Sequence, residues 1–328
     1  MFRRLHSISA LAALALSLAI LLLTSPAHAV DGSGAISLTI SPNVRGEAMG
    51  GLYSTQSRDY SARWGNPALL AFIDQRTAGM MYSKLVPGLA EDVYYMYGGL
   101  VHPTQSLGTY QVDITYLSYG TSDAVDTDGN VFDTFNSYEV SPALGLGFKF
   151  LPNLGLGVAV KWVRVDLAPS SVIQDAPGSG SGTGNSWAFD LGTAYDHERF
   201  RIGAVAANLG PDIAFIDNEQ SDPMPRLLRV GGMYEIYNSE LGDVRAGAEW
   251  ERSLVTFKTP SIFHAGAEFV YAGLFAARAG YIHDKDGDIK SPTGGFGVRW
   301  AKAALEYANA PQATGLDRLH RLALWLSW

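Results

Sequence analysis

The residues best suited to chemistry are two short acidic runs that resemble the start of a calcium-binding loop. One is DKDGD, beginning at Asp284, and the other is DTDGN, beginning at Asp126. A complete loop of this kind has glycine at its sixth position and a bidentate acid at its twelfth. The sixth positions here are Ile289 and Val131. We therefore predict acidic turns at outer loop tips and no metal site.

The histidines beyond residue 30 offer no catalytic or metal-ligating spacing. They are His102, His197, His264, His283 and His320. No G-x-S-x-G nucleophile motif accompanies them. The absence of cysteine from all 328 residues excludes disulfides, thiol catalysis and Cys-ligated metals. We expect no catalytic residues, no cofactor and no enzymatic activity, and a Ser/His hydrolase is the alternative that the sequence leaves open.

Charged residues recur at alternate positions in the second half of the chain. By alternation, all of them fall on one face of successive predicted strands: Arg229, Arg245, Glu249, Glu268, Arg278, Arg299, Glu306 and Arg321. One interpretation is a paired polar network that fills a narrow interior. The other is a selectivity lining for a permeant solute. Both stay open, because pairing across strands depends on register.

The elements that carry these residues are predicted to be transmembrane β-strands. Apolar and aromatic residues alternate with Gly, Ala and isolated charges, as in 110–116, YQVDITY. That mixture suits a barrel with a lipid-facing outside and a narrow polar inside. No apolar run long enough for a spanning helix follows residue 30. We predict an all-β fold, a transmembrane antiparallel barrel of fourteen strands, beginning near 77, 91, 107, 137, 154, 185, 199, 226, 243, 261, 273, 293, 302 and 318.

The predicted connections alternate between short and long. The links after the fourth, sixth, tenth and twelfth strands are tight, whereas 120–135, 169–183 and 210–225 are long. Outer-membrane barrels have short periplasmic turns and long outer loops. The closing strand alternates apolar residues up to an aromatic end, as Leu322, Leu324, Leu326 and Trp328. We interpret this pattern as a barrel assembly signal, with an ordinary edge strand as the alternative.

The amino terminus has the layout of a secretory signal peptide. Arg3 and Arg4 precede an apolar run over 8–23, and Ala27-His28-Ala29 is a small-x-small cleavage site. A single anchoring helix is the alternative. We predict a signal peptide over 1–29. The mature chain then has 22 basic and 32 acidic residues, a net charge of −10, so we expect no nucleic-acid partner.

The segment before the first strand lacks sustained alternation but is rich in apolar residues. We predict that 30–76 forms a plug in the barrel mouth or lumen, and that 77–328 is the barrel. The run RGEAMGGLYSTQSRDYSARWGNPALLAF resembles the opening of PorV/PorQ proteins, a branch of the fatty-acid-transporter-like outer-membrane barrels. The motif positions that carry this resemblance are Arg45, Met49, Gly50, Gly51, Trp64, Asn66, Pro67 and Ala68.

Further stretches, among them SKLVPGLAEDVYY, LGLGVAVKWVRVDLA and LEYANAPQATGLDRLHRLALWLSW, extend the resemblance over most of the mature chain. The resemblance implies a bacterial outer-membrane protein of type IX secretion. It also implies non-catalytic binding of the carboxy-terminal β-domain of secreted cargo, and delivery to a surface attachment complex. The expected partners are outer-membrane lipid, such cargo, and the secretion and attachment machinery. A transporter for hydrophobic or small solutes, as in the wider group, is the alternative.

Overall fold

The computed structural model describes residues 34–56, 58–126, 128–173, 182–215, 221–256, 259–285, 287–312 and 316–328. The chain divides into two units, Met1–Asp31 and Gly32–Trp328, and every described residue belongs to the second. The predicted signal peptide, 1–29, therefore lies outside the described residues. Among the described helices, none combines the length and the apolar character that a membrane crossing requires.

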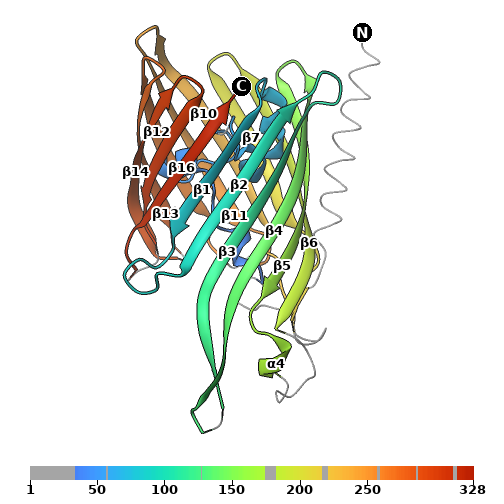
Figure 1. Cartoon of the computed structure of the whole chain (residues 1–328). Helices are drawn as coiled ribbons and strands as arrows, with labels where there is room; N and C mark the ends of the chain where they lie inside the picture. The colour runs from blue at the N-terminus through green and yellow to red at the C-terminus, as the bar shows by residue number, and fades with distance from the viewer. Residues whose placement is uncertain are drawn as a thin grey trace. The chain divides into compact units, whose positions relative to one another are not determined.

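Fourteen antiparallel strands of the described chain close into a barrel, as predicted (Figure 1). Strands that follow one another in the barrel wall also follow one another in sequence, and β1 pairs with β16 to close it. The strands are β1 (Thr77–Lys84), β2 (Val93–Pro103), β3 (Thr109–Val125), β4 (Val131–Leu151), β5 (Leu154–Asp166), β6 (Thr183–His197), β7 (Phe200–Leu209), β10 (Leu227–Ser239), β11 (Gly242–Ser253), β12 (Ile262–Tyr271), β13 (Phe275–Asp284), β14 (Ile289–Trp300), β15 (Ala303–Ala310) and β16 (Leu319–Ser327).

The two faces of the wall follow the alternation of the sequence. On β3, Val112 and Ile114 are 55% and 50% exposed, whereas Gln111 and Asp113 are almost fully buried. The exposed apolar side chains form the surface that lipid covers in a membrane barrel, and the buried polar ones face the lumen. Alternation thus sorts the side chains correctly between lipid and lumen.

The predicted loop over 120–135 is wrong. Strands β3 and β4 continue through it as a long hairpin, with pairs from Gly120↔Ser137 to Val125↔Val131, and this hairpin extends beyond the rest of the wall (Figure 1). Both of its faces meet water there, so no apolar alternation marks it. Cross-strand side-chain bonds support it instead, including Thr121 Oγ1 to Asn136 Oδ1 at 2.8 Å.

The long connections at this end differ in structure. The β5–β6 connection contains α4 (Ser170–Ile173), and part of it, 174–181, lies outside the described residues. The β7–β10 connection contains a short pair, β8 (Ile213–Ala214) with β9 (Ser221–Asp222), and its residues 216–220 are likewise not described. Ile213 and Met224 of this connection are fully buried. They pack with Ala35 and Leu38 in one apolar cluster that covers the lumen.

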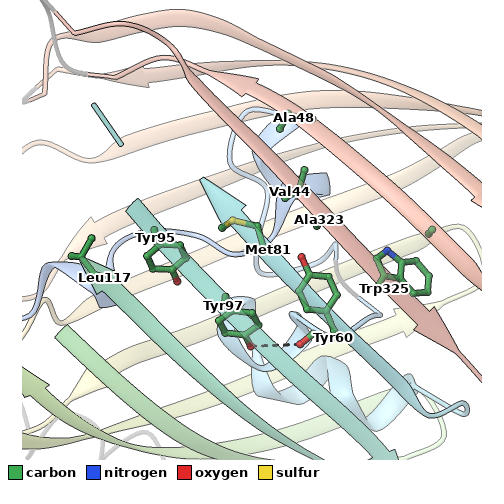
Figure 2. Packing of buried hydrophobic residues seen from close by; sticks show 11 residues of the cluster. Val44, Ala48, Tyr60, Met81, Tyr95, Tyr97, Leu117, Ala323 and Trp325 are labelled. Carbon is green, nitrogen blue, oxygen red and sulfur yellow. Dashed lines mark hydrogen bonds between the residues drawn. The ribbon is translucent and has the colours of Figure 1, made fainter. Parts of the chain in front are cut away.

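The predicted plug lies inside the barrel. Its short helices are η1 (Ile36–Leu38), α2 (Val44–Ala48), α3 (Ala62–Gly65) and η2 (Pro67–Phe72). The plug begins near the long connections, where the Ser37 amide donates to Glu139 at 2.8 Å. It ends at the short turns, where β1 begins. Midway, Tyr60 packs with Tyr97 and Trp325 of the wall (Figure 2).

Candidate functional site

Glycines of the barrel wall give the plug its seat. A Cβ on Gly157 would lie 2.2 Å from the Ala68 nitrogen, and one on Gly280 would lie 2.1 Å from the Gly50 nitrogen. No real side chain tolerates such distances, so the plug backbone rests directly on the wall. The wall glycines at which an added Cβ would lie less than 3.0 Å from a backbone or side-chain atom of the plug are Gly79, Gly99, Gly145, Gly147, Gly155, Gly157, Gly192, Gly203, Gly231, Gly266, Gly280 and Gly295.

The Met-Gly-Gly turn of the motif lies against β12 and β13. Gly50 and Gly51 have φ values of +81° and +92°, which side-chain-bearing residues rarely adopt. His264 Nδ1 bonds to the Gly50 carbonyl at 2.6 Å, and a Cβ on Gly51 would meet that ring at 2.5 Å. The Gln56 amide donates to Met49 Sδ at 2.8 Å. Both the turn and its contact with the wall therefore require these glycines.

The Asn-Pro-Ala part of the motif forms the start of η2 and a bridge to the wall. Asn66 Oδ1 accepts from the Ala68 amide at 3.0 Å and so caps the helix. Its Nδ2 donates to the Ser54 carbonyl at 3.1 Å and to the Thr193 carbonyl of β6 at 3.0 Å. Pro67 occupies the first helical position, where its missing N–H costs nothing. The Asn66 side chain thus forms hydrogen bonds with backbone groups of both the plug and the wall.

Most of the predicted lumen charges are ion-paired. Glu268 of β12 accepts from Arg45 of the plug at 2.8 Å and from Arg278 at 2.6 Å. Arg278 also bonds to Glu306 of β15. Arg245 lies 3.9 Å from Glu268. The network therefore joins α2 to four strands of the wall, β11, β12, β13 and β15.

A second group surrounds Arg229 of β10. Its guanidinium bonds to Glu251 and lies over the rings of Trp64 and Tyr53, with Cζ 4.7 Å and 5.0 Å from their centroids. Glu249 accepts from the Tyr53 amide at 3.1 Å. Trp64, the aromatic residue of the motif, therefore makes a cation–π contact with a residue of the wall.

The other two predicted charges lie apart. Arg321 of β16 bonds to Glu47 of the plug at 3.3 Å and also to the Ser41 carbonyl. Arg299 is exposed at the short-turn end, with its Cζ 5.0 Å from the ring centroid of Trp325. Seven of the eight predicted charges thus join or flank the plug, and Arg299 does not.

Sequence reasoning missed a third network, centred on Arg63 of the plug. Arg63 bonds to Asp113 of β3 at 2.7 Å and to Asp190 of β6 at 3.2 Å. Lys161 of β5 bonds to Asp190 at 2.6 Å, and the Asn208 amide donates to the same carboxylate at 2.8 Å. All five side chains are at least 95% buried. A sequence pattern could have located this network, since alternation places Asp113 and Asp190 opposite the apolar faces of their strands.

The acidic runs form turns at loop tips. Asp126 Oδ1 accepts from the amides of Asp128 and Asn130 at 2.9 Å and 2.8 Å, at the tip of the β3–β4 hairpin. Asp284 Oδ1 accepts from the Gly287 amide at 3.1 Å, in the β13–β14 connection. Over the ranges that the structure describes, no group of three metal-ligating side chains occurs.

The closing strand presents its alternating apolar residues outward. Leu322, Leu324 and Leu326 are about half exposed, as is Trp328. The backbone of Trp328 exchanges two hydrogen bonds with Arg76, at 3.0 Å and 3.1 Å, where the plug joins β1. A role of this strand as an assembly signal remains a prediction.

The β3–β4 hairpin is the part of the outer end that stands free. Strand β2 pairs with β3 as far as Tyr119, and β5 pairs with β4 from Tyr138 onward. No described strand covers the outer edges of the hairpin beyond these points. Val125, Val131 and Phe132 at its tip are 56–58% exposed. Unpaired edges with exposed apolar side chains can accept another strand.

Two cavities open at the opposite, short-turn end of the lumen. Their volumes are about 220 Å³ and 440 Å³, and charged side chains from the plug and the wall line both. The smaller reaches the β6–β7 turn at Glu198 and Arg199, and the larger reaches the β12–β13 turn at Gly273 and Leu274. The smaller cavity lacks the apolar lining that a hydrophobic solute would need, whereas the larger one mixes charged side chains with apolar ones such as Phe72, Phe275 and Trp325.

Comparisons with known proteins agree on the fold. The Pseudomonas putida toluene transporter TodX shares 15% identity with a TM-score of 0.51, over 86% of this chain and 95% of that chain. A Pseudomonas aeruginosa FadL homologue shares 13% identity with a TM-score of 0.52, over 90% of this chain and 99% of that one. No curated protein matches. At these identities the likeness concerns the barrel architecture alone.

The family comparison is more specific. The family described as type IX secretion system protein PorV matches residues 28–261, which is well over half of the chain. The matched region includes the whole plug, the Arg63 network and the free hairpin. The chain therefore belongs to the PorV family of type IX secretion system proteins, and its place is the bacterial outer membrane.

Proposed function

We propose that this protein binds the carboxy-terminal β-domain of secreted proteins at its outer face and delivers them to the surface attachment machinery. The proposal assigns it no enzymatic activity. Membership of the PorV family supports a role in type IX secretion. The observation that carries the proposal is the β3–β4 hairpin, which extends beyond the barrel wall while the plug occupies the lumen. Binding is then the task of the outer end, while the plug keeps the membrane sealed.

The hairpin suits a partner made of β-strands. Its outer edges present backbone N–H and C=O groups that an extended segment can pair with, as in strand addition. Between Gly120 and Ser137 the sequence has four acidic residues and no basic one. Opposite charges across neighbouring strands are favourable and like charges are not. The cargo strand that binds here should therefore carry Lys or Arg.

Transport of a hydrophobic solute, the alternative, is supported by the likeness of the barrel to TodX and the FadL homologue. Against it, the lumen is occupied by the plug and by buried ion pairs such as Arg63–Asp113. Charged side chains form most of the lining of the smaller cavity and part of the lining of the larger one. An apolar solute would have to displace paired charges from their partners, which is costly. We therefore favour the cargo carrier.

A complementation experiment tests this proposal. In a strain that lacks the protein, one plasmid restores the native chain and another a variant with 121–136 replaced by Asn-Gly. That change joins the paired residues Gly120 and Ser137 through a favourable two-residue turn. The control variant is Arg299→Gln, at the other end of the barrel. Boiled and unboiled samples on a detergent gel show whether each barrel folds.

We expect secreted proteins with carboxy-terminal β-domains to reach the surface with the native chain and with Arg299→Gln. With the shortened hairpin they should remain in the periplasm or be released unattached. Normal surface display in the strain that lacks the protein would contradict the proposed function. Normal display with the shortened hairpin would contradict the assignment to the hairpin.

A further inference from the structure

The smaller cavity at the short-turn end has an unusual charge composition. Five arginines and three acidic residues line its 220 Å³, and they come from the plug, β6, β7, the β6–β7 turn, β10 and β11. This volume is below the roughly 300 Å³ at which sites for drug-sized ligands begin. The cavity can therefore hold a small molecule or a single terminal group of a larger one.

Two of these arginines share one carboxylate oxygen. Arg58 of the plug bonds to Asp196 Oδ2, and Arg201 of β7 bonds to the same atom at 3.2 Å. A second nitrogen of Arg201 donates to the Thr55 carbonyl at 2.7 Å. Arg201 Nε is buried and bonds to no described group. A buried guanidinium nitrogen normally has a partner, so one is expected here.

Two of the five arginines have carboxylate partners of their own, since Arg45 bonds to Glu268 and Arg245 to Glu235, so any excess of positive charge lies at the other three. Glu235 bonds to Arg245 through both Nε and Nη2 at 3.2 Å. The side chain of Glu198 is 80% exposed and projects into solvent. Burial, together with the charges of Arg201, Arg45 and Arg245, lowers the pKa of Arg58 to about 9. Burial is the largest cause of this depression, and the like charges of the neighbouring guanidinium groups add to it.

We propose that this cavity binds an oxyanion, a carboxylate or phosphate group presented from the periplasmic side, between Arg58 and Arg201. The planar fork of a guanidinium matches both groups with two parallel hydrogen bonds. Arg201 Nε is a donor without a described partner, and the exposed side of Arg58 offers further donors. The anion restores the missing counter-charge and links the plug to β7. This site is at the end of the barrel opposite the hairpin and is independent of cargo binding.

Titration of the full-length barrel in a non-ionic detergent tests this assignment. Inorganic phosphate and acetate are titrated separately by calorimetry at low ionic strength, and each is then tested as a competitor of the other. The variants are Arg58→Gln and Arg201→Gln. Arg299→Gln, which removes an exposed arginine from the neighbouring cavity at the same end, is the matched control. Heat-modifiable gel mobility checks the fold of each protein.

We expect saturable binding of one anion per barrel. Arg58→Gln and Arg201→Gln should each weaken it tenfold or more, and Arg299→Gln should leave it within twofold. Binding of phosphate alone, or of acetate alone, would support the site and identify the group it takes. No saturable binding to the native barrel, equal weakening by Arg299→Gln, or native-like affinity in folded Arg58→Gln would overturn the proposal.

Discussion

At the residue scale, the family motif is explained by contacts between plug and wall. Asn66 is needed because one amide must cap η2 and bond to β6. Gly50 is needed because its backbone adopts positive φ and lies against Gly280. Alternation predicted which charges face inward. It could not predict their partners, because Arg63 reaches its carboxylates from a segment without periodicity.

The glycine seat leads to a prediction about Gly157. Gly157→Ala places a methyl group 2.2 Å from plug backbone, so it should lower stability by about 1–3 kcal/mol through overpacking. Gly98→Ala is the control, because its nearest neighbour beyond the adjoining residues is 3.9 Å away. Thermal unfolding followed by gel mobility measures both. If the Gly157→Ala barrel unfolds at the same temperature as the Gly98→Ala control, the plug does not rest on this strand.

The Arg63 network gives a second prediction. Arg63→Met leaves Asp113 without its bidentate partner in a fully buried site, and breaking a buried pair in this way costs about 3–5 kcal/mol. Arg164→Met is the control. It removes an exposed arginine bonded to Asp166 at 3.0 Å, worth about 0–1 kcal/mol. Limited proteolysis of the plug and thermal unfolding should distinguish the two, and equal stability would contradict the structure.

At the element scale, the sequence was informative wherever a strand has one lipid face. The starts predicted at 77 and 154 are the observed starts of β1 and β5. Prediction from the sequence failed where the chain extends beyond the membrane. The strands of the hairpin over 120–137 are held by backbone pairing and polar cross-strand contacts, which leave no apolar period to read. The plug helices, which have three to six residues, are too short to show a helical period in the sequence.

The tip of the hairpin should respond to acid through Asp126. Bonds from the backbone and side chain of Asn130 lower the pKa of Asp126 below its usual value. A depressed pKa stabilises the tip above the unfolded value of about 3.9, and this contribution is lost as pH falls through the folded pKa. The Asn130 amide resonance should therefore titrate with a midpoint below about 3.9. Asp126→Asn should abolish that titration, and a midpoint at or above the unfolded value would contradict the turn.

At the scale of the whole molecule, alternation and loop asymmetry were sufficient to predict the barrel and its strand number, and the family resemblance implied its compartment. The sequence predicted a plug in the barrel mouth or lumen, but it could not predict how the lumen is filled. That depends on three-dimensional pairing between the plug and many strands, such as Arg45 with Glu268 and Arg63 with Asp113. The plug and its ion pairs distinguish this structure from an open channel of the same architecture.

The filled lumen predicts an electrically silent barrel. In planar bilayers the native protein should show no steady single-channel current. A variant that lacks 34–72 should show open, salt-dependent conductance wherever it folds into a heat-modifiable barrel, because α2, α3 and η2 lie in the lumen and bond to the wall. A stable current through the native protein would favour a permeation pathway and count against the carrier.

The most direct measurement of the central claim is binding between purified components. The carboxy-terminal β-domain of a secreted protein from the same organism is titrated onto the immobilised barrel in detergent. We predict saturable binding that weakens with salt. It should persist in Arg299→Gln and be lost when 121–136 is replaced by Asn-Gly. An intact, folded barrel that binds no such domain, or a shortened hairpin that binds it with native affinity, would contradict the account.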